Sequence, residues 1–267
     1  MAAPTLDTVL TGLAHGEATG SLRVGKDGTV YLTRGRVSYV ECAATPGVED
    51  LLGASDRITA SGVRHARQEA GRSDGGALLV SKGVLSRGEL EFCVLSATLD
   101  AAFFLLRPFL FQGRTARTRF REGDGHWLGV HWYFDVPGLL GECARRRARL
   151  ERAWPSDELD TRAVTPLRRI PGTHALLTPL QWELLLAADS TATPVELARR
   201  LGHPAYSTLL AVRELAAAGL LATDRAAPDE QPDELPRRTP RPPAVPVADA
   251  VTDVNLLLRV RDALEAL

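Results

Sequence analysis

Residues Thr178 to Leu221 read TPLQWELLLAADSTATPVELARRLGHPAYSTLLAVRELAAAGLL and contain the clearest helix signals of the chain. Thr178 and Thr193 are each followed by proline, and a threonine cap with proline at the first helical position predicts a helix start at both points. Gly202 ends the second helix, because glycine readily takes the left-handed conformation that closes a helix. The third helix then has an apolar side made of Leu209, Val212, Leu215 and Ala216. We expect three short helices, the last two in a helix-turn-helix arrangement.

Two runs in this stretch resemble the winged-helix regulators of bacteria. They are VELARRLGH, residues 195–203, and STLLAVRELAAAGLL, residues 207–221. The resemblance covers about one sixth of the chain and implies a winged-helix domain over residues 172–225, with its third helix in the major groove of DNA. The residues alone leave open any compact three-helix unit with an alanine and leucine core.

The N-terminal part of the chain has the pattern of a small antiparallel sheet. Gly20 to Val24 alternates polar and apolar residues, and Asp27-Gly28 is a favoured pair for a hairpin turn. Thr29–Thr33 and Val37–Ala43 are then expected to be the second and third strands. The flanking segments predict helices over Leu6–Ala14 and from Pro46 onwards.

These strands resemble the N-terminal domain of PatA-type bacterial regulators. The matching residues are Gly20, Leu22, Val24, Val30, Tyr31, Leu32, Gly35, Arg36, Val37 and Gly47, followed by Gly76–Val80, Lys82–Ser86 and Glu89–Leu90. The resemblance implies a regulatory or protein-interaction domain over residues 1–125. The sequence departs from the family pattern between Ala54 and Asp74, where it is polar and where we expect irregular structure.

A long apolar helix is expected over Ser86–Leu106. Ser86 and Glu89 have the spacing of a capping box, in which each satisfies a free amide at the helix start. Its apolar surface is so broad that the helix either lies between the sheet and another layer or forms part of a dimer interface. Strands over Phe109–Phe111 and Arg117–Arg121 would close the sheet, so the fold class is α+β.

Residues 126–171 contain an aromatic run, an arginine-rich helix and a connector. His126 and His131 lie five residues apart, which is not a same-face spacing on a helix or a strand, so packing is favoured over a metal site. In the helix Asp135–Ala153, a basic patch comprises Arg145, Arg146 and Arg149. Such a run is usually a solvated face, the interpretation we favour, although arginine also suits phosphate contacts.

The composition limits the class of protein. With 267 residues the chain is long enough for two domains, and its net charge of −1 argues against non-specific coating of nucleic acid. Three scattered cysteines indicate reduced thiols. No stretch has the ~18–20 apolar residues of a bilayer span, and no secretion signal is recognisable. We expect a cytoplasmic protein without membrane contact, and the preference for arginine over lysine suggests a GC-rich bacterium such as an actinomycete.

The C-terminal part of the chain changes character after the three helices. Residues 226–248 are rich in proline and charge and predict a disordered linker. Asp249–Leu267 is again helical in pattern, with an apolar seam. Because so short a helix is marginal in water, we expect it to dock on its own chain, on a second protomer or on another protein.

The sequence favours a regulator without catalytic activity. It contains none of the phosphate-loop, nucleophile-elbow or HExxH motifs, and we expect no catalytic, cofactor or metal site. The first hypothesis is a transcriptional regulator, for which the winged-helix resemblance implies DNA contacts from Arg199, Arg200, Tyr206, Ser207, Thr208 and Arg213. The alternative is a signalling adaptor whose three-helix unit and C-terminal helix bind proteins. Self-association through residues 1–125 or Asp249–Leu267 is left open in both.

Overall fold

A computed structural model of the chain describes residues 5–53, 60–70, 74–106, 117–169, 172 and 174–223. They belong to one compact unit that ends at Thr223. Their helices and strands make a mixed α+β fold, as the sequence predicts. The expected linker over residues 226–248, the expected docking helix Asp249–Leu267 and the expected strand Phe109–Phe111 lie outside the described residues.

Within these residues, four antiparallel strands make one sheet in the order β3-β2-β1-β4. Four of the five expected strands are confirmed to within one residue, with the bounds β1 Gly20–Val24, β2 Gly28–Thr33, β3 Arg36–Cys42 and β4 Thr118–Glu122. Leu22 on β1 is paired with Val30 on one side and Phe120 on the other. Because side chains of paired residues point to the same face of a sheet, this register gives the sheet one apolar face.

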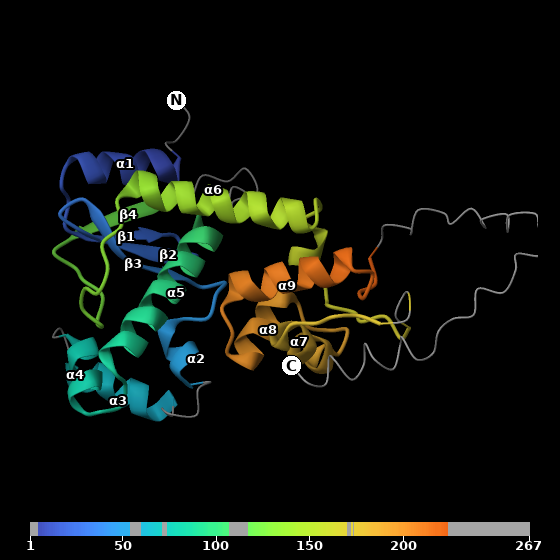
Figure 1. Ribbon diagram of the computed structural model, residues 1–267. Coiled ribbons are helices and arrows are strands. Elements are labelled where there is room, and N and C mark those ends of the chain that lie inside the picture. Colours follow the sequence, from blue (N-terminus) through green and yellow to red (C-terminus); the bar gives the residue numbers. More distant parts are fainter. Residues whose placement is uncertain are drawn as a thin grey trace, which may run out of the picture. The chain divides into compact units, whose positions relative to one another are not determined.

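Three helices pack with this face in the largest core cluster. They are α1 Leu6–His15, α5 Arg87–Leu105 and α6 Val136–Ala153. Leu10 of α1, Leu139 of α6 and Phe103 of α5 are buried together with Leu22 and the other inward-facing strand residues. Figure 1 shows α6 running beside α1 and on towards α9.

The α5 helix confirms its predicted cap and its predicted place between layers. The Ser86 side chain accepts from the Glu89 amide and the Glu89 side chain accepts from the Ser86 amide, so the capping box is formed. Residues of α5 contact β3, α6 and α9, and most of its length is buried. Packing between elements therefore accounts for the apolar surface of this helix; the dimer interface stays a prediction.

A second core cluster lies around the first half of α5. It includes residues of three short helices, α2 Val48–Gly53, α3 Ala60–Ala70 and α4 Gly75–Ser81. The expectation of irregular structure over Ala54–Asp74 is wrong for residues 60–70, which form α3. Val63, Ala66 and Ala70 of α3 are buried, and their spacing of three and four residues is helical, but they are too few to stand out in a polar stretch.

The aromatic run packs into this second cluster, which confirms its predicted role. Trp127 and Leu128 are buried there, and the His126 ring stacks on the Tyr39 ring at 3.7 Å between centroids. The Gly75 amide donates to the Trp127 carbonyl at 2.9 Å. A Cβ at Gly75 would collide with the Trp127 ring, so glycine permits this close approach.

The three helices expected after Thr178 are present. They are α7 Pro179–Ala187, α8 Pro194–Leu201 and α9 Ala205–Ala217. Thr178 and Thr193 each form a capping box, and Gly202 ends α8 with a φ of 71°. These details confirm the predicted helix starts and the predicted stop.

The α9 helix is buried on nearly every side, because it packs in two cores at once. Its first half contributes Ala205, Tyr206, Leu209 and Leu210 to the cluster shared with the sheet, α5 and α6. Its second half contributes Ala211, Val212, Leu215 and Ala216 to a third cluster with residues of α7, α8 and the connector. A helix that is apolar all round is a buried helix, and here α9 joins the three-helix unit to the sheet.

Candidate nucleic-acid interface

The first turn of α9, where DNA contacts are expected, meets a carboxylate from α5. Pro204 stands at the cap position of α9 and supplies no side-chain hydrogen bond to the free amides of the first turn. The Tyr206 amide instead donates to Asp100 Oδ2 at 3.1 Å. An anion at a helix N-terminus is favoured by the free amides and by the helix dipole. Asp100 therefore fills the place at which a DNA phosphate could otherwise bind.

Arg146 holds Asp100 from the side of α6. Its Nη1 donates to Asp100 Oδ1 at 2.7 Å, and its guanidinium lies 4.5 Å from the centre of the Tyr206 ring. The Tyr206 ring also meets Phe103 edge to face, with centroids 5.3 Å apart. Burial raises the pKa of the Asp100 carboxyl, and the Tyr206 amide and the Arg146 charge oppose that rise.

This arrangement corrects the expectation that Arg146 belongs to a solvated basic face. Its side chain is only 15% exposed and is paired with Asp100 and with Glu142. Within α6, Arg146 Nε donates to Glu142 Oε1 at 3.2 Å. Arg145 and Arg149 lie on the exposed part of the helix, as expected.

Arg213 is a structural residue in this fold. It is 2% exposed, its Nε and Nη2 donate to Asp160 at 2.9 and 2.8 Å, and its Nη1 donates to the Trp154 carbonyl at 2.8 Å. Asp160 comes from a short 3-10 helix, Glu158–Asp160. A guanidinium paired in this bidentate way and closed off from solvent is not available to a DNA phosphate in this structure.

The other expected DNA contacts are also scattered or covered. Thr208 is buried, and its hydroxyl donates to the Pro204 carbonyl at 3.1 Å, whereas Ser207 is half-buried. Arg199 and Arg200 of α8 are exposed; Arg199 donates to the Ala43 carbonyl, and Arg200 pairs with Asp189 at 3.1 Å. The expected residues thus do not form one open surface, and DNA binding by α9 stays a prediction that needs α9 to separate from α5 and α6.

One group of expected residues does come together, in a hollow that we call the arginine hollow. It has a volume of about 450 Å³. The described residues that line it are Glu142, Arg145, Arg146, Ala148, Arg149, Arg152 and Tyr206. The basic patch predicted on α6 and the predicted contact residue Tyr206 therefore share one site, together with Arg152 of the same helix.

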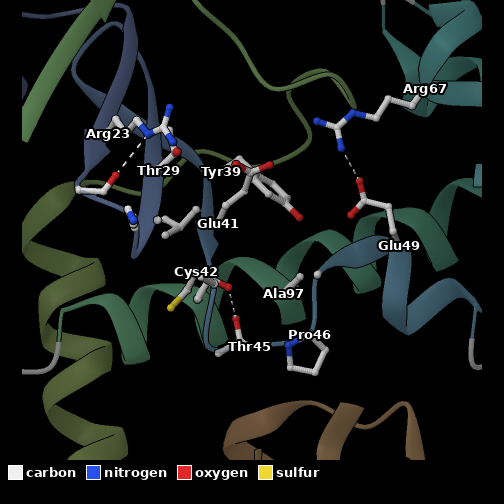
Figure 2. A pocket seen from close by; sticks show the side chains of 17 residues that line it. Arg23, Thr29, Tyr39, Glu41, Cys42, Thr45, Pro46, Glu49, Arg67 and Ala97 are labelled. Carbon is white, nitrogen blue, oxygen red and sulfur yellow. Dashed lines mark hydrogen bonds and ion pairs between the residues drawn. The ribbon is translucent and has the colours of Figure 1, made fainter. Parts of the chain in front are cut away.

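A second cavity, of about 370 Å³, opens beside the sheet near the turn after β3 (Figure 2). Several of its polar groups are paired with one another. Arg67 lies 3.2 Å from Glu49, and the Thr45 hydroxyl donates to the Cys42 carbonyl at 3.3 Å. In Figure 2, Arg67 and Glu49 lie to the right of Tyr39 on the wall of the cavity, and Cys42 and Thr45 lie below it.

Glu41, also on this wall, is held by two neighbours. The Tyr31 hydroxyl donates to Glu41 Oε2 at 3.2 Å, and His126 Nε2 lies 3.2 Å from Glu41 Oε1. Burial acts to raise the pKa of Glu41, but the contacts with His126 and Tyr31 outweigh it and lower that pKa. The carboxylate thus acts as an acceptor that fixes the aromatic cluster.

Two residues that hold α9 in place, Asp100 and Asp160, are not among those that the sequence patterns single out. Asp100 is a lone charge within the apolar run of α5, and Asp160 is the partner of Arg213. A charged residue inside an otherwise apolar helix face was the available signal for Asp100, because such a charge is rarely buried unless it is paired. The partners, 46 and 53 residues away along the chain, gave no local signal.

Comparison with protein-family models, with curated proteins and with solved structures finds no match to this chain. Within the described ranges, no helix combines the length and apolar character needed to cross a membrane. The same residues contain no group of three or more side chains that could hold a metal ion.

Proposed function

We propose that this chain is a non-enzymatic signalling adaptor, in which the three-helix unit is an internal structural element and binds protein through its outer helix. The observation that carries this proposal is the burial of α9. Of the α9 residues expected to contact DNA in its first turn, Tyr206 and Thr208 are buried and Ser207 is half-buried, inside the same unit as the sheet. A helix used in this way contributes stability and a fixed geometry.

The outer helix α7 offers a surface for a protein partner. Trp182 and Leu186 lie one turn apart on α7 and are 55% and 68% exposed, and the side chain of Leu176 just before the helix is also exposed. Large apolar side chains grouped on a surface are typical of protein contacts, and tryptophan is frequent at their energetic centres. The resemblance of residues 1–125 to PatA-type regulatory domains supports the same class of function.

Partner capture tests the adaptor. We would compare the proteins that co-purify with the full chain, with Trp182→Ser/Leu186→Ser, and with the control Phe92→Ser. Phe92 is 70% exposed on α5, so the control removes an apolar side chain from another surface. The adaptor predicts a partner that is recovered with wild type and control and is lost with the α7 variant. Equal recovery with all three chains would argue against α7 as the docking surface.

DNA binding is the second candidate, because α8, the Gly202 turn and α9 retain the helix-turn-helix connection and the arginine hollow adjoins α9. For DNA binding, α9 must separate from α5, and this separation would expose Tyr206, Ser207 and Thr208.

Binding to genomic fragments at two salt concentrations distinguishes the two functions, with wild type compared with Asp100→Asn and Arg199→Ala/Arg200→Ala. A regulator would bind specific fragments in a salt-dependent way, more strongly after Asp100→Asn. If no fragment is enriched with any of the variants, DNA binding is ruled out and the adaptor proposal remains.

A further inference from the structure

We propose that the arginine hollow on α6 is a binding site for an oligophosphate, a compact ligand with two or more linked phosphates such as a nucleoside triphosphate. The site does not depend on the adaptor function. It rests on the charge, the spacing and the concave shape of the residues that line the hollow.

The net positive charge of the residues that line the hollow favours a ligand with several negative charges. Among the described residues that line the hollow, four arginines accompany one carboxylate, Glu142, which already pairs with both Arg145 and Arg146. Arg146 is also paired with Asp100, so Arg145, Arg149 and Arg152 carry the unbalanced positive charge. Arg149 has no ion-pair partner within the described part of the chain, and Arg152 donates from Nε to the Ala148 carbonyl of its own helix. Arginines remain charged at all physiological pH values, so their mutual repulsion is relieved when several negative charges enter the hollow.

The spacing of the arginines suits a ligand longer than one phosphate. Arg145, Arg149 and Arg152 follow one another by four and three residues along α6 and so share a helix face. At 1.5 Å per residue they extend over about 10 Å of the helix axis. A single phosphate can accept from one or two guanidinium forks, whereas linked phosphates can accept from the whole row.

Arg146 gives the hollow a fixed wall. Its guanidinium is held by Asp100 and Glu142 and lies over Tyr206, so little conformational entropy is lost when a ligand reaches it. Preorganised donors of this kind raise affinity by lowering the cost of ordering. The same guanidinium supports the first turn of α9, so a bound oligophosphate would contact the junction between α5, α6 and α9.

The shape of the site favours a small ligand over a nucleic-acid duplex. A hollow of about 450 Å³ lies within the usual range for small-molecule sites. The phosphates of a duplex, by contrast, follow a convex rod. A solvated basic face would have the same charge, but it would lack the concave shape and a largely covered, paired arginine such as Arg146.

Isothermal titration calorimetry of the full chain with inorganic tripolyphosphate, pyrophosphate and orthophosphate tests this site. We expect saturable binding of one tripolyphosphate per chain, weaker binding of pyrophosphate and the weakest of orthophosphate. Affinity should fall between about 50 and 200 mM salt, as for other phosphate contacts. Arg149→Gln/Arg152→Gln should weaken tripolyphosphate binding at least about tenfold, because it removes two charged donors.

The matched control is Arg119→Gln/Arg121→Gln, which removes two exposed arginines from β4 and should leave the affinity unchanged. All four side chains are exposed, so both double variants should keep the wild-type thermal unfolding. No saturable tripolyphosphate binding at millimolar concentration would overturn the proposal, as would an equal loss in both double variants. Binding of a short DNA duplex that only the hollow variant loses, without tripolyphosphate binding, would assign the hollow to nucleic acid instead.

Discussion

At the scale of single residues, the buried charges of this protein act as connectors. Arg213 with Asp160, and Arg146 with Asp100, join elements far apart along the chain. Removing one partner of a buried ion pair leaves an uncompensated charge, which costs more than the pair itself contributes. These residues are therefore expected to affect folding before they affect binding.

Asp160→Asn should destabilise the fold by about 3 kcal/mol, because Arg213 would stay buried without its counter-charge. The free energy of unfolding from urea titration measures this effect. Asp157→Asn, three residues earlier and exposed, should change it by less than about 0.5 kcal/mol. If Asp160→Asn were as mild as this control, Arg213 would not be the structural residue described above.

Glu41 gives a pH dependence with a definite sign. Its pKa is lowered in the folded protein, so its contribution to stability is complete above the unfolded-state pKa of about 4.3 and is lost as the pH falls through the lower, folded value. The difference in unfolding free energy between wild type and Glu41→Gln should thus be complete above about pH 5 and shrink below about pH 4. Because solvent screens this partly exposed group, we expect roughly 0.5 kcal/mol. A difference that grows on acidification would contradict the assignment.

At the scale of elements, local signals were sufficient where a helix is defined by its own sequence. The caps at Ser86, Thr178 and Thr193 and the stop at Gly202 were predicted from neighbouring residues, and the structure forms them. The interactions behind these signals span three or four residues, so they are visible without tertiary structure.

The cap of α5 supplies a test at this scale. Ser86→Ala should cost about 1 kcal/mol of stability, because it leaves an amide of the first turn without its acceptor. Ser86→Thr keeps the hydroxyl and should cost much less. Urea unfolding of both variants measures the difference; equal stabilities would show that the capping box contributes little to this long, buried helix.

Prediction of the candidate site failed where burial depends on distant elements. The apolar side of α9, with Leu209 and Val212, was recognised from its period, and these residues are buried. Tyr206, Thr208 and Arg213 are expected on the DNA-contacting side because the winged-helix resemblance implies contacts from these positions. Tyr206 is covered by residues of α5 and α6 and Arg213 by the connector, and Thr208 is buried. No pattern within residues 205–217 could show this.

At the scale of the whole molecule, α9 is the element on which the functional proposal depends. The first half of the helix belongs to the core of the sheet and the second half to the core of the three-helix unit. Residues 1–125 and 172–225, predicted as separate domains, thus contribute to one continuous packing arrangement in the described residues. We therefore expect the core of the sheet and the core of the three-helix unit to unfold together.

Native-state hydrogen exchange of α5 (Arg87–Leu105) and α9 (Ala205–Ala217) measures whether the two helices open together. If α9 is a fixed part of the shared core, its slowest amides and those of α5 should exchange with the same free energy of opening and respond to denaturant with the same slope. Exchange of α9 through an opening at least about 2 kcal/mol below that of α5 would contradict the account and would describe a helix free to leave its site for DNA.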